Sequence, residues 1–85
     1  MAKMMTMEEL YARIEPWAGM KGHYCYHRRT KRRYIITDVV LRVSDLSVEV
    51  VYRNMGKITV SFTRPVEEFK ERFEIGHHWS QEEDG

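Results

Sequence analysis

The sequence predicts an α+β domain in which strands predominate. In residues 48–63, apolar side chains alternate with polar ones on both sides of residues 54–56, which is typical of two strands joined by a tight turn. After this hairpin the apolar spacing changes to three and four residues, at Val66, Phe69 and Phe73, as on one face of a helix. With further short strands before it, this pattern predicts a small SH3-like antiparallel barrel with an N-terminal helix and a short C-terminal helix. Closing a barrel leaves no exposed sheet edge.

A helix is expected over residues 6–15. Thr6 and Glu9 have the spacing of a capping box, in which each side chain accepts a hydrogen bond from a free backbone N–H of the first turn. The apolar stripe consists of Met7, Leu10, Tyr11 and Ile14. Pro16 is expected to end the helix, because the residue before a proline is disfavoured in helical geometry. Trp17 is expected to pack on the domain, since so short a helix needs packing to persist.

The next elements are a first strand at residues 23–27, a charged hairpin loop at residues 28–33 and a long strand at residues 34–43. Strict alternation in the long strand puts Ile35, Val39, Leu41 and Val43 on one face, and Tyr34, Ile36 and Val40 on the other. Apolar groups on both faces predict a bent strand that serves two packing surfaces.

The final helix is expected to start at Pro65, where the missing N–H has no cost, and to be capped by Gly76. Residues 77–85 are expected to form a loose tail. The predicted core is Val50, Tyr52, Ile58, Val60, Phe62, Phe69 and Phe73. Residues 1–85 are predicted to form a single domain, in which residues 22–75 supply the barrel and the final helix.

Composition limits the class of protein. The chain has 85 residues and a net charge of +1, which offers no global attraction to nucleic acid or to a membrane. Cys25 is the single cysteine, so an internal disulfide is excluded. No apolar run approaches the ~18 residues of a membrane span, and no signal peptide is evident. A cytoplasmic protein without a membrane partner is expected.

Two short motifs resemble a family of short bacterial and phage domains of unknown function. The first is the sequence Val-Val-Tyr-Arg at residues 50–53, followed by a glycine turn, and the second is Arg-Pro at residues 64–65, followed by Phe69. Gly22 and Tyr24 match the Gly-x-Tyr with which members of the family begin.

The resemblance covers residues 22–75 and implies a small SH3-like barrel of no known activity in a bacterial or phage setting. Two features depart from the family. Its usual tryptophan before Arg-Pro is absent from residues 60–62, and the basic run at residues 28–33 replaces a His-Tyr-Lys-Gly step.

Three potential metal ligands alternate in the first strand. His23, Cys25 and His27 would share one face, and imidazole and thiolate are good ligands for zinc or copper. A fourth ligand would come from His77 or His78. The alternative is that the tyrosines between them face the core and the three residues face solvent. Because the spacing is not a known zinc signature, no metal or other cofactor is expected.

No catalytic arrangement is expected either. A Cys–His nucleophilic pair needs an orienting third group and an oxyanion hole, and the sequence marks neither. The protein is therefore predicted not to be an enzyme.

The strongest functional feature is a basic run flanked by tyrosines. The candidate residues for binding an anion or nucleic acid are Arg28, Arg29, Lys31, Arg32, Arg33, Tyr24, Tyr26 and Tyr34. Arginines neutralise phosphates, and tyrosines offer stacking faces to unpaired bases. The alternative is that the acidic residues within positions 67–74, or those of a second copy, neutralise the run.

A second candidate site lies at the central hairpin. Arg53 and Arg64 flank it and are expected to point together toward the barrel mouth, where they would hold a small anionic ligand. The alternative is that they pair with Glu49, Glu67 or Glu68.

These patterns predict a small non-enzymatic binding module. As a phage or prophage accessory protein, it would bind or inhibit a host protein or sequester an anionic ligand. The expected partner is a protein or a second copy of the chain. The alternative function is nucleic-acid binding through the hairpin at residues 28–33.

Overall fold

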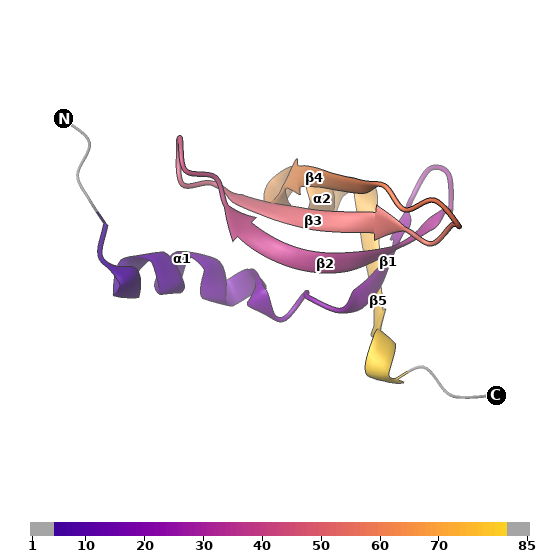
Figure 1. Cartoon of the computed structure of the whole chain (residues 1–85), viewed down its shortest axis with the longest axis horizontal. Helices are drawn as coiled ribbons and strands as arrows, with labels where there is room; N and C mark the ends of the chain where they lie inside the picture. The colour runs from indigo at the N-terminus through magenta and orange to yellow at the C-terminus, as the bar shows by residue number, and fades with distance from the viewer. Residues whose placement is uncertain (1–4, 82–85) are drawn as a thin grey trace.

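The computed structural model describes residues 5–81 and shows a small α+β domain built mainly from strands (Figure 1). Its elements are α1 (Met7–Ala18), β1 (His23–His27), β2 (Arg33–Leu41), β3 (Val48–Asn54), β4 (Ser61–Pro65), α2 (Val66–Arg72), β5 (Phe73–His78) and a short 3-10 helix, η1 (Trp79–Gln81). The strands form a five-stranded antiparallel sheet in the order β4-β3-β2-β1-β5. Neither helix has the length and apolar character needed to cross a lipid bilayer.

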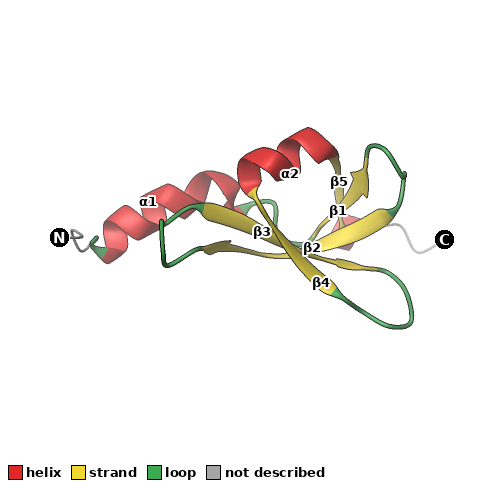
Figure 2. Ribbon diagram, turned by 90° about the horizontal axis from the view of Figure 1, so that it is seen from above, coloured by secondary structure: helices red, strands yellow, loops and turns green. Residues whose placement is uncertain are grey.

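The sheet is open. β4 and β5 form its two edges, and within residues 5–81 they do not pair with each other. The α+β class with two helices is therefore confirmed, whereas the closed SH3-like barrel is not. Helix α2 joins the two edges and packs on one face of the sheet (Figure 2). We call this the inner face; it carries Val50 and Tyr52.

Helix α1 begins as predicted but ends later. Glu9 N donates to Thr6 Oγ1 at 3.2 Å and Thr6 N donates to Glu9 Oε1 at 3.1 Å, so the capping box is formed. The helix continues through Pro16 to Ala18, so the prediction that Pro16 ends it was wrong. Proline removes one helical hydrogen bond, but the last turn still has tertiary contacts: Trp17 packs against the core and lies under Lys70 Nζ at 4.8 Å.

A bulge in β2 corrects the predicted faces of this strand. The pairing of β2 with β3 shifts between Ile36 and Asp38. The extra residue reverses the alternation, so Ile36 and Val39 lie on the same inner face, at 0% and 7% exposure. The prediction that put them on opposite faces was wrong. The apolar residues on both nominal faces belong largely to one packing surface on a curved strand (Figure 1).

The core lies between the inner face and α2. Phe69 and Phe73 are stacked with their ring centroids 4.4 Å apart, and Tyr52 packs against both. The four predicted core residues Val50, Tyr52, Phe69 and Phe73 are buried. The other three, Ile58, Val60 and Phe62, are 81%, 47% and 42% exposed.

The turn before β4 explains this error. The side chain of Asn54 holds an extended loop, because Nδ2 donates to Ile58 O at 2.9 Å and Oδ1 accepts from Val60 N at 2.7 Å. β4 therefore starts only at Ser61, and Ile58 and Val60 lie outside the sheet. Phe62 is in the sheet, but β4 is an edge strand, and among residues 5–81 only β3 pairs with it.

The end of the chain is more ordered than predicted. Helix α2 stops at Arg72, and the next six residues form β5 on β1, so Gly76 is not a helix cap. A Cβ at Gly76 would lie 2.9 Å from the Tyr26 ring, so the glycine permits close approach of the two strands. The predicted tail at residues 77–85 is corrected for residues 77–81, which belong to β5 and η1. Residues 82–85 lie outside the described part of the chain.

Candidate functional site

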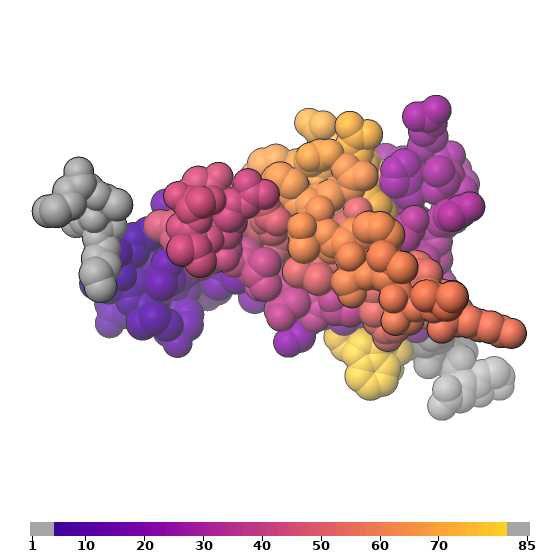
Figure 3. All heavy atoms as spheres, turned by 45° about the horizontal axis from the view of Figure 1, so that its top comes forward, coloured from indigo at the N-terminus to yellow at the C-terminus, as the bar shows by residue number. Residues whose placement is uncertain are grey.

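A cleft of about 470 Å³ opens on the inner face, between the loop at residues 28–32 and the edge strand β4. We call it the aromatic cleft. Its lining consists of His27, Thr30, Arg32, Tyr34, Tyr52, Phe62, Arg64 and Phe73. In Figure 3 the loop, in purple, projects at one end of the molecule, across from the orange atoms of β4. The cleft has the size of small-molecule sites.

Four aromatic rings form its wall and floor. Tyr52 and Phe62 are direct partners across β3 and β4, so their rings share a face and lie 5.5 Å apart, only 29° from parallel. Tyr34 stands nearly perpendicular to Tyr52, at 5.5 Å and 88°. Tyr52 and Phe73 are buried, whereas Phe62 is exposed and Tyr34 is half-buried. A ligand therefore meets Phe62 and Tyr34 first.

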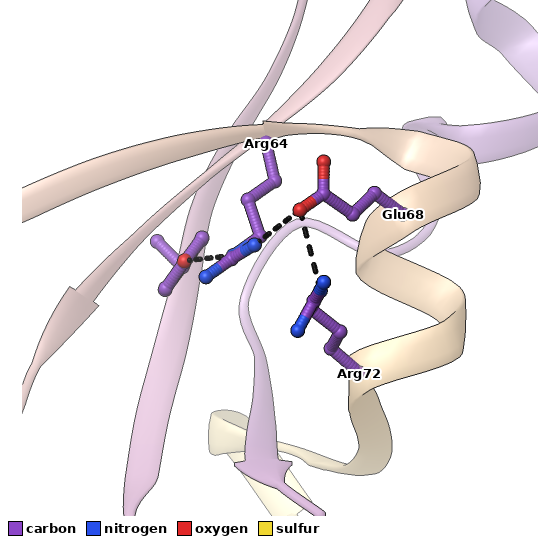
Figure 4. A network of polar contacts seen from close by, with 4 residues as sticks. Arg64, Glu68 and Arg72 are labelled. Carbon is purple, nitrogen blue, oxygen red and sulfur yellow. Dashed lines mark hydrogen bonds and ion pairs between the residues drawn. The ribbon is translucent and has the colours of Figure 1, made fainter.

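Arg64 adds a fixed positive charge. It lies two residues after Phe62 in β4 and so on the same face. Its Nε donates to Tyr52 Oη at 2.9 Å and its Nη1 to Glu68 Oε1 at 2.5 Å, and Glu68 also binds Arg72 Nε at 3.3 Å (Figure 4). The hydrogen bond to Tyr52 raises the pKa of Arg64, and the opposing effect of burial is smaller. The guanidinium group therefore remains charged and oriented.

The loop at residues 28–32 supplies the opposite wall. His27 organises it, since its Nδ1 accepts from the backbone N–H groups of Arg29 and Thr30, both at 3.2 Å. Its carbonyl accepts from Lys31 N at 2.8 Å, and its N–H donates to Arg32 O at 3.0 Å. Because Nδ1 is an acceptor, the proton of the neutral ring lies on Nε2.

The basic side chains of this loop are only partly paired with acidic ones. Arg28 reaches Glu74 Oε2 at 3.9 Å. Within residues 5–81, no carboxylate forms an ion pair with Arg29, Lys31 or Arg32. The acidic residues of α2 therefore do not neutralise the tip of the loop.

The sheet divides the basic run and its tyrosines between two faces. Cys25 pairs with Tyr34 on the inner face, and Tyr26 pairs with Arg33 on the outer face. Arg33 lies over the ring of Tyr24, 4.8 Å from its centroid. Of the basic run and its flanking tyrosines, only Arg32 and Tyr34 line the aromatic cleft.

The two arginines of the central hairpin are not brought together. Arg64 pairs with Val50 on the inner face, while Arg53 pairs with Ser61 and so lies on the outer face. The expectation that both point to one mouth is contradicted by this register. The alternative holds for Arg64, which pairs with Glu68.

The proposed metal ligands are each engaged elsewhere. Cys25 is fully buried in the core, so the alternative that it faces solvent is corrected. His23 Nδ1 lies 2.8 Å from Gly76 O, and His27 Nδ1 holds the loop. Of the predicted fourth ligands, His77 packs on Tyr24. The part of the chain that the structure describes contains no group of three such side chains arranged to hold a metal ion.

The burial of Cys25 gives a testable prediction. Desolvation raises the pKa of its thiol from 9.0 to about 12, so the thiol stays protonated at neutral pH. We expect iodoacetamide to label the native protein only as fast as it unfolds, and the unfolded protein rapidly. The raised pKa also means that stability present below pH 9 is lost as the pH rises toward 12. Rapid labelling of the native protein would contradict this burial.

Sequence reasoning missed most of the aromatic cleft. Phe62 was assigned to the core, although its place two residues before Arg64 puts both on one strand face. The sequence pointed to His27 as a metal ligand or a member of a Cys–His pair, and not as the residue that organises the loop. Comparisons with family models, curated proteins and solved structures found no match to this chain. Its function therefore has to be argued from the chemistry of the cleft.

Proposed function

We propose that the protein is a non-enzymatic binding module that holds a small anionic ligand with a flat ring in the aromatic cleft. One observation carries the proposal: the accessible rings of Phe62 and Tyr34 share a cleft with the guanidinium groups of Arg32 and Arg64, and no carboxylate from residues 5–81 lines it. Rings offer flat apolar contact, and guanidinium groups bind carboxylate or phosphate. Both parts of such a ligand find complementary groups.

Preorganisation of Arg64 supports the proposal. Its hydrogen bonds to Tyr52 and Glu68 fix the guanidinium plane before a ligand arrives. Nη2 has no hydrogen-bond partner within residues 5–81 and is available to a ligand. Arg64 and Arg72 share the single carboxylate of Glu68, so the three side chains together keep a net positive charge. A fixed side chain loses little entropy on binding.

The fold and setting are part of the same proposal. The order in which β5 returns to β1 after α2 supports an open variant of the SH3-like barrel. The resemblance to short bacterial and phage domains of no known activity supports a bacterial or phage setting, and in that setting we propose an accessory protein that sequesters its ligand. Burial of Cys25, the nucleophile of the Cys–His pair considered from the sequence, supports a non-enzymatic role.

Titration calorimetry with phenyl phosphate tests the function. We expect phenyl phosphate to bind about tenfold or more tightly than inorganic phosphate or phenol, because it uses both walls. Arg64→Met should weaken binding by roughly tenfold or more, the cost of losing a charged hydrogen bond. Arg53→Met is the matched control, since this arginine lies on the same hairpin but on the other face. Equal losses in both variants, or no binding by the wild-type protein, would refute the site.

A second candidate is single-stranded nucleic acid bound by the loop at residues 28–32. It is favoured by the absence, within residues 5–81, of ion pairs to Arg29, Lys31 and Arg32. Short oligothymidine should then bind with a log–log salt slope of about −0.7 per phosphate neutralised. Replacing Arg29, Arg32 and Arg33 by Ala should flatten that slope without unfolding the protein. Undetectable binding at physiological salt would exclude this function.

A further inference from the structure

The aromatic corner of the cleft suits a planar base. Phe62 is 42% exposed and continues the near-parallel stack that begins with Tyr52. Tyr34 meets Phe62 at 6.2 Å and 85°, so the two accessible rings form a corner. A flat heterocycle on Phe62 would extend the stack and meet Tyr34 at its border. Stacking of this kind accepts any base, because every base has a π-face.

The loop side of the cleft presents hydrogen-bond donors. Arg32 carries a guanidinium group with no ion-pair partner within residues 5–81. The Thr30 hydroxyl oxygen accepts from Arg32 N at 3.3 Å, and its O–H, which has no acceptor within residues 5–81, can donate to a ligand. His27 carries its ring proton on Nε2, because Nδ1 is an acceptor. With Nη2 of Arg64, these groups match an acceptor with several oxygens, as a phosphate is.

Size and charge distribution narrow the ligand further. A volume of about 470 Å³ exceeds the needs of a bare anion or a single ring. The four rings come from four strands, β2, β3, β4 and β5, whereas most of the donors come from the loop and its base. A ligand that reaches both sets of groups therefore needs a spacer between its ring and its anionic part. Two guanidinium groups, those of Arg32 and Arg64, line the cleft, and the chain has a net charge of only +1, which matches one phosphate group better than a row of phosphates.

We propose that the ligand of the aromatic cleft is a nucleotide, with its base on Phe62 and Tyr34, its sugar as the spacer, and its phosphate between Arg32 and Arg64. This inference rests on the proposed function and names the ligand class of that same site. The base contacts the rings and the phosphate contacts the guanidinium groups. The affinities of fragments of the nucleotide therefore measure these two contributions to the binding free energy separately.

Titration calorimetry with adenosine monophosphate, adenosine and ribose phosphate tests this division. We expect the nucleotide to bind at least about tenfold more tightly than either fragment. Phe62→Leu keeps apolar area but removes the ring, so it should weaken nucleotide binding about tenfold and leave ribose phosphate unaffected. Arg32→Ala should weaken binding of the nucleotide and of ribose phosphate about tenfold, but not of adenosine. Arg29→Ala, in the same loop but outside the cleft, is the matched control and should change nothing.

Each alternative outcome has a distinct meaning. If phenyl phosphate binds but the nucleotide binds no more tightly, the nucleotide assignment fails and the proposed function stands. If neither binds, both fail. Oligothymidine that binds more tightly than the nucleotide, in a manner that depends on Arg29, would replace the nucleotide with a strand. Thermal melting of each variant checks the fold, and Phe62→Tyr, which keeps a stacking ring, should retain binding.

Discussion

Phe69→Ala is expected to lower the free energy of unfolding by about 3–5 kcal/mol. Phe69 is fully buried, its ring lies parallel to that of Phe73 at 4.4 Å, and it packs on Tyr52 at 5.4 Å. Removing the ring leaves a cavity where the aromatic side chain of α2 packs on Tyr52 and Phe73. A domain of this size has a total stability of about 5–15 kcal/mol, so much of it would be lost.

Urea denaturation followed by circular dichroism measures this loss. Phe62→Ala is the matched control, because its ring is 42% exposed and we expect it to cost no more than about 1 kcal/mol. If Phe69→Ala unfolds at the same urea concentration as the wild-type protein, α2 is not part of the core.

Arg42→Ala is expected to lower the free energy of unfolding by about 2–3 kcal/mol. Glu49 is 6% exposed, and its Oε2 lies 2.7 Å from Arg42 Nη2. This contact is an ion pair and not a well-aligned hydrogen bond, and Oε2 has no other partner within residues 5–81. Loss of the arginine leaves a buried carboxylate without a countercharge, which is costly in a medium of low polarity.

A double-mutant cycle separates this cost from the net value of the pair. We expect Arg42→Ala combined with Glu49→Leu to recover most of the lost stability, because no charge then remains buried. Urea denaturation of the four proteins gives the coupling energy. A double variant as unstable as the sum of the single changes would show that the pair does not interact.

Local signals in the sequence predicted the elements whose causes are local. Thr6 and Glu9 set the start of α1, and the spacing of three residues between Val66 and Phe69 matches one face of α2. The bulge in β2 could not be predicted, because it arises from the way β2 pairs with β3. The shift in that pairing lies between Ile36 and Asp38. The prediction therefore assumed strict alternation of side chains along the whole of β2, including the bulge where the alternation reverses.

β5 was missed for a related reason. Its sequence is short, contains Gly76 and two histidines, and has weak intrinsic strand propensity. It is a strand because β1 offers it backbone hydrogen bonds along an uncovered edge. Local propensity says nothing about such a tertiary partner.

The candidate site was predictable only in pieces. Side chains alternate between the faces along each strand, so Arg53 lies on the face opposite to Tyr52, and Arg64 on the face of Phe62. Since Tyr52 and Phe62 are cross-strand partners, the separation of Arg53 from Arg64 could have been predicted from the sequence. The sequence could not tell which face would remain open to solvent. The cleft exists because β4 and the loop at residues 28–32 border an open side of the sheet, and that opening is a consequence of the whole fold.

The location of the ligand can be mapped by heteronuclear NMR during a titration with phenyl phosphate. Phe62 and Tyr34 report on the ring side of the aromatic cleft, and Arg64 on its charged side. Trp17 and Trp79 lie outside its lining and serve as internal controls. We expect the resonances of Phe62, Tyr34 and Arg64 to shift together and saturably, while the two indole signals stay in place. Shifts centred on Trp17 or Trp79, or none in the rings of the cleft, would show that the ligand does not bind there.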